Sequence, residues 1–171
     1  MTFYSIATYS EAKAIIDRFG LKKSAEFYES DDIKLVISGM GAVKSAVATT
    51  KLLSKYEAKK DDVIFNIGVA GANFETSLGS IYEVKKVVDF CSKSILTLKG
   101  GDKKLITYPS ATYKCDIKNS LVDMEGYGFL ASAKEFIDIE NIMIKKVVSD
   151  LLDPKSFDKA KVYEWIRKCV E

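Results

Sequence analysis

Apolar and polar positions alternate along the chain in patterns that predict strands and helices in turn. Residues 62–68, DVIFNIG, form a nearly continuous apolar run, which is typical of a central strand buried on both faces. Residues 25–39 predict a hairpin whose turn lies at 30–32. The same patterns predict further strands at 3–10, 80–90, 94–98, 104–108 and 142–149, and helices at 11–20, 42–56, 124–136 and 153–171.

Two of the expected helices have a recognisable apolar side. In residues 42–56, the side that we expect to face the core carries Val43, Ala46, Val47, Thr50 and Leu53. In the closing helix, the side that we expect to be buried carries Phe157, Trp165, Ile166 and Cys169. Gly20 and Pro154 stand at expected helix boundaries.

Strands and helices that alternate in this way predict an α/β fold. We expect a single domain, residues 1–171, built on a central mixed, largely parallel sheet that is flanked by helices. In open sheets of this kind, ligands bind outside the carboxyl ends of the strands. Residues that follow the strands are therefore the first candidates for a functional site.

Glycines follow two of the expected strands. Gly39 and Gly41 stand between a strand and a helix, where exposed amide groups can hold an anion or a sugar hydroxyl. Taken alone, a tight turn without a ligand explains this pair better. Gly68 and Gly71 flank Ala70 and leave the backbone open to a ligand, and a bulge is the alternative there.

Composition excludes several classes of partner. The net charge is only +2, from 26 basic and 24 acidic residues, so we expect neither nucleic acid nor a membrane as a partner. The sequence has no apolar run of bilayer length and no signal-peptide pattern. Three cysteines, far apart and odd in number, favour a reducing compartment, and we expect a cytoplasmic protein.

The chain contains no histidine. This excludes the usual zinc ligands and any Ser–His or Cys–His nucleophile, so acid–base chemistry would depend on other side chains such as carboxylates. Two carboxylates stand at suitable positions, Glu125 at the start of an expected helix and Asp150 at the end of an expected strand. Each also has a purely structural explanation, because Asp123 and Glu125 suit a helix start and Ser149-Asp150 suits a turn.

Five segments, taken in order, resemble the family of purine nucleoside phosphorylases, uridine phosphorylases and methylthioadenosine/S-adenosylhomocysteine nucleosidases. They are SGMGAVKSAVAT at 38–49, DVIFNIGVAGAN at 62–73, LGSIYEV at 78–84, VDMEGYGFLASA at 122–133 and IKKVVSD at 144–150. The Met-Glu pair and the Ser-Asp ending are the most specific of these features. The resemblance implies a nucleoside phosphorylase-like fold and a small-molecule nucleoside as ligand.

The resemblance also implies a role for individual residues. Glu125 resembles the glutamate that holds the ribose hydroxyls, and Asp150 resembles the acid that protonates a purine at N7. Glu11 resembles the carboxylate that activates water. The other residues that the resemblance brings to the substrate are Met124 on the sugar face, Val69, Ala70 and Gly71 beside sugar and base, Ser149 next to the acid, Lys146 at a commonly basic position, and Gly39 and Gly41 at the start of a helix.

This set of carboxylates suits the cleavage of an N-glycosidic bond. The sugar gains oxocarbenium character while the base gains negative charge, so an acid at the base and a carboxylate near the ribose both lower the barrier. We therefore expect neither a metal nor an organic cofactor.

Three departures from the family bear on the reaction. The region between Asp89 and Leu121 is short, and Phe90, Tyr108 and Tyr113 are the candidates there for stacking on the base. The only arginines, Arg18 and Arg167, lie outside the matched segments. Val69 stands where a hydroxyl residue is common. The last two features weigh against a phosphate site.

We therefore expect hydrolysis of a purine nucleoside or a 5′-modified one. A phosphate-dependent phosphorylase with the same fold is the first alternative. The second is a catalytically weak nucleoside-binding protein, suggested by the short region. Members of the resembled family are commonly homo-oligomers, and we expect one here.

Overall fold

The computed structural model of the chain describes residues 1–153 and 157–171. Within these residues, ten strands form one sheet and four α-helices cover it. The strands are β1 Thr2–Ile6, β2 Lys22–Ser24, β3 Phe27–Glu29, β4 Ile33–Ile37, β5 Val63–Ala72, β6 Ile81–Asp89, β7 Ile95–Thr97, β8 Lys103–Thr107, β9 Ser120–Asp123 and β10 Ile142–Asp150. The helices are α1 Tyr9–Phe19, α2 Ala42–Lys55, α3 Gly126–Phe136 and α4 Val162–Cys169.

The long strand β5 organises the sheet. It pairs in parallel with β1 and β10, and β1 pairs in parallel with β4. On the other side, β10, β6, β8 and β9 continue the sheet until β9 returns to β5, so these five strands close into a barrel. The expected mixed sheet is confirmed; pairing is parallel at its centre, while the hairpin strands β2 and β3 are antiparallel.

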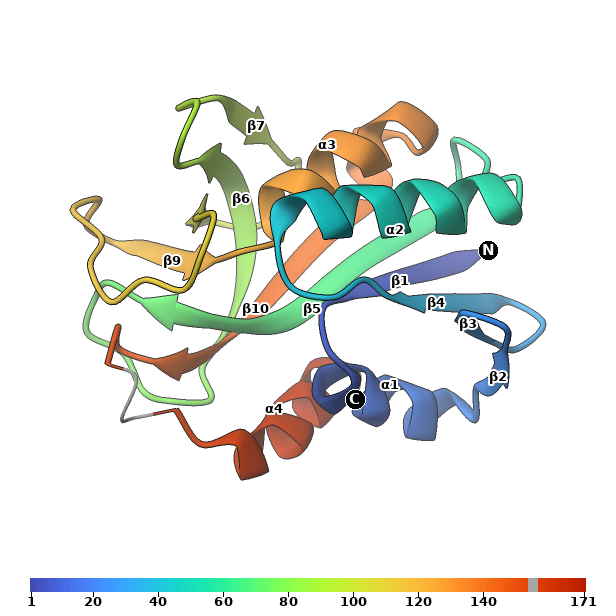
Figure 1. Cartoon of the computed structure of the whole chain (residues 1–171), viewed down its shortest axis with the longest axis horizontal. Helices are drawn as coiled ribbons and strands as arrows, with labels where there is room; N and C mark the ends of the chain where they lie inside the picture. Colours follow the sequence, from blue (N-terminus) through green and yellow to red (C-terminus); the bar gives the residue numbers. More distant parts are fainter. Residues whose placement is uncertain (154–156) are drawn as a thin grey trace.

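Helices cover both faces of the sheet (Figure 1). Helices α2 and α3 lie on one face over a core that includes Leu52, Leu53 and Phe129. Helices α1 and α4 lie on the other face over a second core that includes Ile15 and Ile166. Within the part of the chain that the structure describes, no helix has both the length and the apolar character needed to cross a bilayer.

Several sequence predictions agree with this fold. The hairpin at 25–39 is confirmed by antiparallel pairing of β3 with β4. Helix α1 ends at Gly20, whose φ of 60° is the left-handed conformation that glycine adopts without strain. Asn66, a polar residue in an otherwise apolar strand, donates from Nδ2 to the backbone oxygen of Ser5 at 2.8 Å. The sequence missed the short strands β2 and β9.

The predicted buried side of α2 was largely wrong, although Leu53 is buried as predicted. Val43 and Val47 are 79% and 52% exposed. The other buried residues of the helix are Ser45, Thr49 and Leu52. Thr49 fits this close contact because its Oγ1 donates to Ser5 Oγ on β1 at 2.9 Å, whereas the buried Oγ of Ser45 has no hydrogen-bond partner among the described residues.

The closing helix is shorter than predicted. It begins at Val162 rather than at 153, and it buries Trp165 and Ile166 but only partly buries Cys169. Phe157 precedes it and is 43% exposed, so its predicted burial was wrong. The expected boundary at Pro154 lies outside the described residues.

Candidate active site

Two adjoining cavities lie at the carboxyl ends of the central strands. The first has a volume of about 280 Å³ and the second about 370 Å³, and Val69, Glu125 and Phe157 line both. The first is lined by Val69, Ala70, Gly71, Ser110, Ala111, Thr112, Tyr113, Val122, Asp123, Met124, Glu125, Ser149, Asp150, Leu152 and Phe157. These volumes are of the size that small-molecule sites have.

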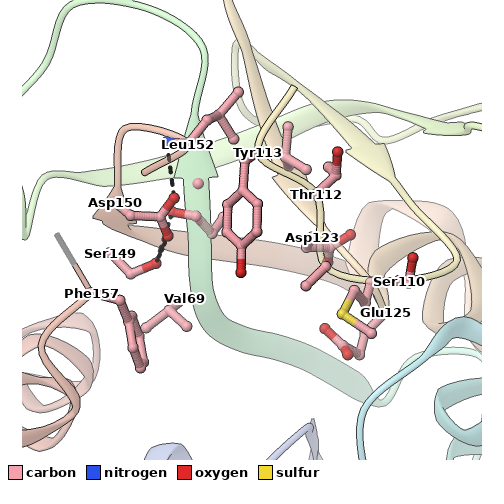
Figure 2. Close-up of a pocket in the computed structure, with 15 residues that line it drawn as sticks. Val69, Ser110, Thr112, Tyr113, Asp123, Glu125, Ser149, Asp150, Leu152 and Phe157 are labelled. Atoms are coloured by element: carbon pink, nitrogen blue, oxygen red, sulfur yellow. Dashed lines mark hydrogen bonds between the residues drawn. The ribbon is translucent and has the colours of Figure 1, made fainter. Parts of the chain in front are cut away.

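The two acids singled out in the sequence line the same cavity. Figure 2 shows Asp150 and Ser149 on one side, Asp123 and Glu125 on the other, and Tyr113 between them. Asp150 ends β10, while Glu125 follows β9, so the barrel closure brings together residues that are 25 positions apart. One ligand can therefore contact both carboxylates.

The carboxylate of Asp150 is held by its neighbours. Ser149 Oγ donates to Asp150 Oδ2 at 2.8 Å, and the backbone N–H of Leu152 donates to Oδ1 at 2.9 Å. A side chain at Gly71 would place its Cβ 3.0 Å from Asp150 Oδ1 and 2.8 Å from Leu152 Cδ2. The absence of a side chain at Gly71 therefore leaves room for this arrangement.

Glu125 does not cap its own helix with its side chain. Its Oε1 instead accepts the backbone N–H of Gly41, at the start of α2, at 2.8 Å. The capping contact belongs to Asp123, whose Oδ2 accepts the N–H of Gly126 at 2.8 Å while Oδ1 accepts from Thr107 Oγ1 at 2.8 Å. Helix capping, the structural explanation for this acidic segment, therefore holds for Asp123 but not for the side chain of Glu125.

Burial changes the pKa of Glu125. The residue is 7% exposed, and desolvation, followed by the negative charge of Asp123, raises its pKa to about 7. Lys146 and the Gly41 N–H act in the opposite direction. A carboxyl with this pKa changes its charge near neutral pH.

Glu11 belongs to the second cavity. Its Oε2 accepts from Thr8 Oγ1 at 2.7 Å in a capping box at the start of α1, and its Oε1 accepts the N–H of Val69 at 2.9 Å. The second bond ties the start of α1 to the end of β5. Glu11 is 4% exposed, so its carboxylate is fixed and largely shielded at the cavity wall.

Lys146 lies behind the cavities rather than in them. Its Nζ is 2.9 Å from Asp123 Oδ2 and 2.8 Å from Asn66 Oδ1, and the residue is 2% exposed. Burial opposes its charge, but Asp123, Glu125 and Glu11 outweigh this effect and raise the pKa of Lys146 above its ordinary value. Neither a solvent-facing lysine nor a cavity-lining one fits this position.

The structure places the remaining candidates as follows. Met124, Val69, Ala70, Gly71 and Ser149 line the first cavity. Gly41 reaches the site through its bond to Glu125, and both Gly39 and Gly41 have positive φ, of 80° and 110°. Gly39 lines neither cavity; its neighbour Met40 lines the second.

Some cavity residues were not found from the sequence. Of the three aromatic candidates in the short region, Tyr113 lines the first cavity, whereas Phe90 and Tyr108 stack on each other with ring centroids 4.1 Å apart. Ser110, Thr112 and Phe157 were missed because loops carry no periodic pattern. Among residues 1–153 and 157–171, no group of three or more Cys, Asp or Glu side chains is arranged so that it could hold a metal ion.

The chain is similar to solved nucleosidase structures. It matches 5′-methylthioadenosine nucleosidase from Arabidopsis thaliana with a TM-score of 0.83 and 17% identity, over 99% of this chain and 92% of that chain. A Helicobacter pylori nucleosidase mutant with 5′-methylthioadenosine in its active site matches with a TM-score of 0.82 and 15% identity, over 97% and 93%. Futalosine hydrolase of Helicobacter pylori matches with 0.75 and 14%, over 98% and 91%.

At these identities, the similarity shows the fold. The chain has the α/β fold of these solved hydrolases, which confirms the fold class expected from the sequence. No protein-family model and no curated protein sequence matches the chain.

Proposed function

We propose that this chain hydrolyses the N-glycosidic bond of a purine nucleoside that carries a modified 5′ position. The observation that supports this most is the shared cavity of Asp150 and Glu125, which lie on its opposite sides. A nucleoside has a basic ring at one end and a diol at the other, so two separated carboxylates suit its two ends. The nucleosidases with the same fold act on such compounds.

The surroundings of each acid support the role that the resemblance implies for it. Asp150 donates a proton to the purine ring as the bond to the sugar breaks, and the hydroxyl of Ser149 fixes the direction of its carboxyl group. Glu125 accepts hydrogen bonds from the ribose hydroxyls and stabilises positive charge on the sugar. Met124 packs on the sugar face, and the open backbone of Val69, Ala70 and Gly71 runs beside sugar and base.

Water is the nucleophile in this proposal. Glu11 lines the second cavity, next to Glu125 and Val69, where its fixed carboxylate can orient a water molecule. Phosphate would need cations, and Lys159 is the only basic residue among the described residues that line either cavity. Both arginines line a different surface recess with Asp17 and Tyr163. This distribution of charge favours hydrolysis over the phosphorylase alternative.

The second cavity suits an apolar 5′ substituent. Its wall includes Ala7, Met40, Val69, Phe157 and Val162. It adjoins the first cavity at Glu125, the residue assigned to the ribose, so a group on the ribose C5′ has a direct path into it. A 5′-alkylthio group matches this lining better than a free hydroxyl does.

Product analysis tests the proposal. The protein is incubated with 5′-methylthioadenosine, adenosine and inosine, with and without phosphate, and the products are separated by chromatography. We expect free base and free sugar without phosphate, fastest from 5′-methylthioadenosine. Sugar 1-phosphate formed only with phosphate would support the phosphorylase, and calorimetric binding without turnover would support the nucleoside-binding protein.

A variant of the proposed proton donor tests its role directly. Asp150→Asn removes the proton donor but keeps a similar shape, so we expect the hydrolysis rate to fall by about 10² to 10⁴. Asp138→Asn, an exposed position, is the matched control and should keep the full rate. Full activity in Asp150→Asn would remove the acid role from that residue.

We also propose that the protein is a cytoplasmic homo-oligomer. Met40, Val43 and Val47 are 62%, 79% and 52% exposed on and just before α2, a concentration of apolar side chains that an oligomer would cover. All three cysteines are free, which suits a reducing compartment. Light scattering should give a mass above that of one chain, and Val47→Glu should lower it; a monomer in the wild type would contradict this proposal.

A further inference from the structure

One buried ammonium faces three carboxylates at the centre of the site. Lys146 on β10 is paired with Asp123 on β9 at 2.9 Å, and its charge also interacts with Glu125 and Glu11. All four residues are at most 7% exposed. Negative groups therefore outnumber positive ones in a region that water screens poorly.

The position of the ammonium is fixed by partners from two neighbouring strands. Besides Asp123, Asn66 on β5 accepts from Lys146 Nζ at 2.8 Å. Asn66 is fixed in turn, since its Nδ2 donates to the backbone of Ser5 on β1. A buried charge needs such partners, because unpaired it would lose its hydration without compensation.

Glycine at position 68 keeps the ammonium close to Glu11. A Cβ at Gly68 would lie 3.6 Å from Lys146 Nζ and 2.8 Å from Glu11 Oε1. The two charged groups therefore flank one point on β5, where no side chain separates them. Lys146 lines neither cavity, so this influence is electrostatic and does not involve contact with a ligand.

We propose that Lys146 is a positioning residue whose buried ammonium, fixed by Asp123 and Asn66, favours the carboxylate form of Glu125 near neutral pH without touching the substrate. Burial and the charge of Asp123 both oppose ionisation of Glu125, whereas Lys146 favours it. Without the ammonium, Glu125 would keep the single Gly41 N–H as its nearby stabilising group from α2. Its protonated form would then dominate at pH 7.

Other charged groups around Glu125 also influence its ionisation. From β9, β10 and α1 it is faced by Asp123, Lys146 and Glu11. Lys159 lines the second cavity with it, and Asp150 lines the first. Lys159 is exposed to solvent and Asp150 lies on the opposite side of the cavity, so among the cations of the described residues the buried lysine has the largest effect on the ionisation of Glu125.

A titration without substrate tests this proposal. The protein is labelled with ¹³C at glutamate side-chain carboxyls, and the signal that Glu125→Gln removes is followed by NMR against pH. In Lys146→Met, we expect the midpoint of Glu125 to rise by about one pH unit or more. Lys145→Met is the matched control, because Lys145 is adjacent on β10 but pairs with Glu83 at the surface. In this variant, the titration midpoint of Glu125 should equal the wild-type value.

A double variant guards against loss of folding. Lys146→Met leaves Asp123 buried without its partner, which can unfold the protein. Asp123→Asn combined with Lys146→Met removes both charges. If the single variant does not fold, the double variant should show a midpoint close to the wild-type one, whereas a midpoint lowered by more than about one unit would overturn the proposal, because Lys146 would then contribute little against Asp123.

The consequence for catalysis rests on the proposed function, and the titration does not. With 5′-methylthioadenosine as probe, the acid limb of kcat/KM should move to higher pH in Lys146→Met by the same shift as the Glu125 midpoint. An unchanged Glu125 midpoint overturns the role of Lys146 even in an active enzyme. Absence of hydrolysis in the wild type overturns the proposed function alone.

Discussion

At the scale of single residues, two glycines in β5 give the site its room. Gly71 leaves space for Asp150, and Gly68 leaves space for Glu11. Neither has a positive φ, so their backbone conformation is open to other residues. Their value to the site is the volume that a side chain would occupy, and this can be tested by adding a single methyl group.

We predict that Gly68→Ala lowers activity more than it lowers stability. The new Cβ would lie 2.8 Å from Glu11 Oε1, so this carboxylate must move from its bond with Val69. A shift of about 1 Å in a catalytic group costs about 10²-fold in rate. Measurement of kcat and Tm checks this.

The control for this variant is Gly100→Ala. A Cβ at Gly100 would meet no atom closer than Glu83 Oε2 at 4.0 Å, so both activity and Tm should stay near the wild-type values. Equal activity in the two variants would show that Glu11 needs no fixed position.

The raised pKa of Glu125 predicts how the free energy of unfolding depends on pH. Its pKa is raised from 4.5 to about 7 in the folded protein, so the unfolded chain releases this proton first as pH rises. The wild type therefore loses stability between about pH 4.5 and 7, whereas Glu125→Gln does not. We expect the difference in unfolding free energy to shift in favour of the variant by about 2–3 kcal/mol between pH 5 and 8.

Urea unfolding at a series of pH values measures this shift. Glu140→Gln, at an exposed position, should show a difference from the wild type that does not vary with pH. A pH-independent difference for Glu125→Gln as well would mean that burial does not perturb this carboxyl.

At the scale of elements, the contact between α2 and α3 positions Glu125. Glu125 precedes α3 but bonds to Gly41 at the start of α2. The two helices can approach closely because Gly128 has no side chain: a Cβ there would lie 1.9 Å from the backbone oxygen of Ala42. The geometry of Glu125 therefore depends on the packing of both helices.

We predict that Gly128→Ala destabilises the protein by about 2 kcal/mol or more. The overlap is with backbone atoms, which cannot rotate away as a side chain can, and the loss should exceed the roughly 1 kcal/mol that alanine gains in helix propensity. Urea unfolding measures it. Lys134→Ala, at an exposed position of the same helix, should change stability by less than about 0.5 kcal/mol, and an equally mild effect at Gly128 would contradict this packing.

The same pair of helices shows where sequence patterns succeed and fail. The period of apolar residues located α2 but predicted only Leu53 among its buried residues. The pattern weighs hydrophobicity, whereas the contact of α2 with β1 uses small polar residues such as Thr49, which bonds to Ser5. Strand β9 was missed because its four residues run directly into the acidic helix start. Both errors come from tertiary contacts that local patterns do not contain.

At the scale of the whole molecule, the closure of the barrel unites the site. Asp150 and Glu125 were found from ordered motifs, and their common cavity follows from the pairing of β5 with both β9 and β10. The sequence could not place Lys146 behind the cavities, because that position depends on burial, and it could not select Tyr113 from three aromatic candidates, because that choice depends on the path of a loop.

We predict that the chain unfolds as a single cooperative domain. The two cores share β5, which contributes Ile64 to one and Ile67 to the other, so neither core should survive alone. The single tryptophan, Trp165, reports on the α4 side, while far-UV circular dichroism reports on all elements. Coincident urea transitions are expected, and a separate early transition of the fluorescence would contradict a single domain.

The most direct test of the central claim is a crystal structure of the Asp150→Asn variant soaked with 5′-methylthioadenosine. We predict one nucleoside spanning both cavities, with the purine N7 beside residue 150, the ribose hydroxyls on the carboxylate of Glu125 and the methylthio group near Phe157. A nucleoside bound elsewhere, or one that reaches only one of the two acidic positions, would contradict the account.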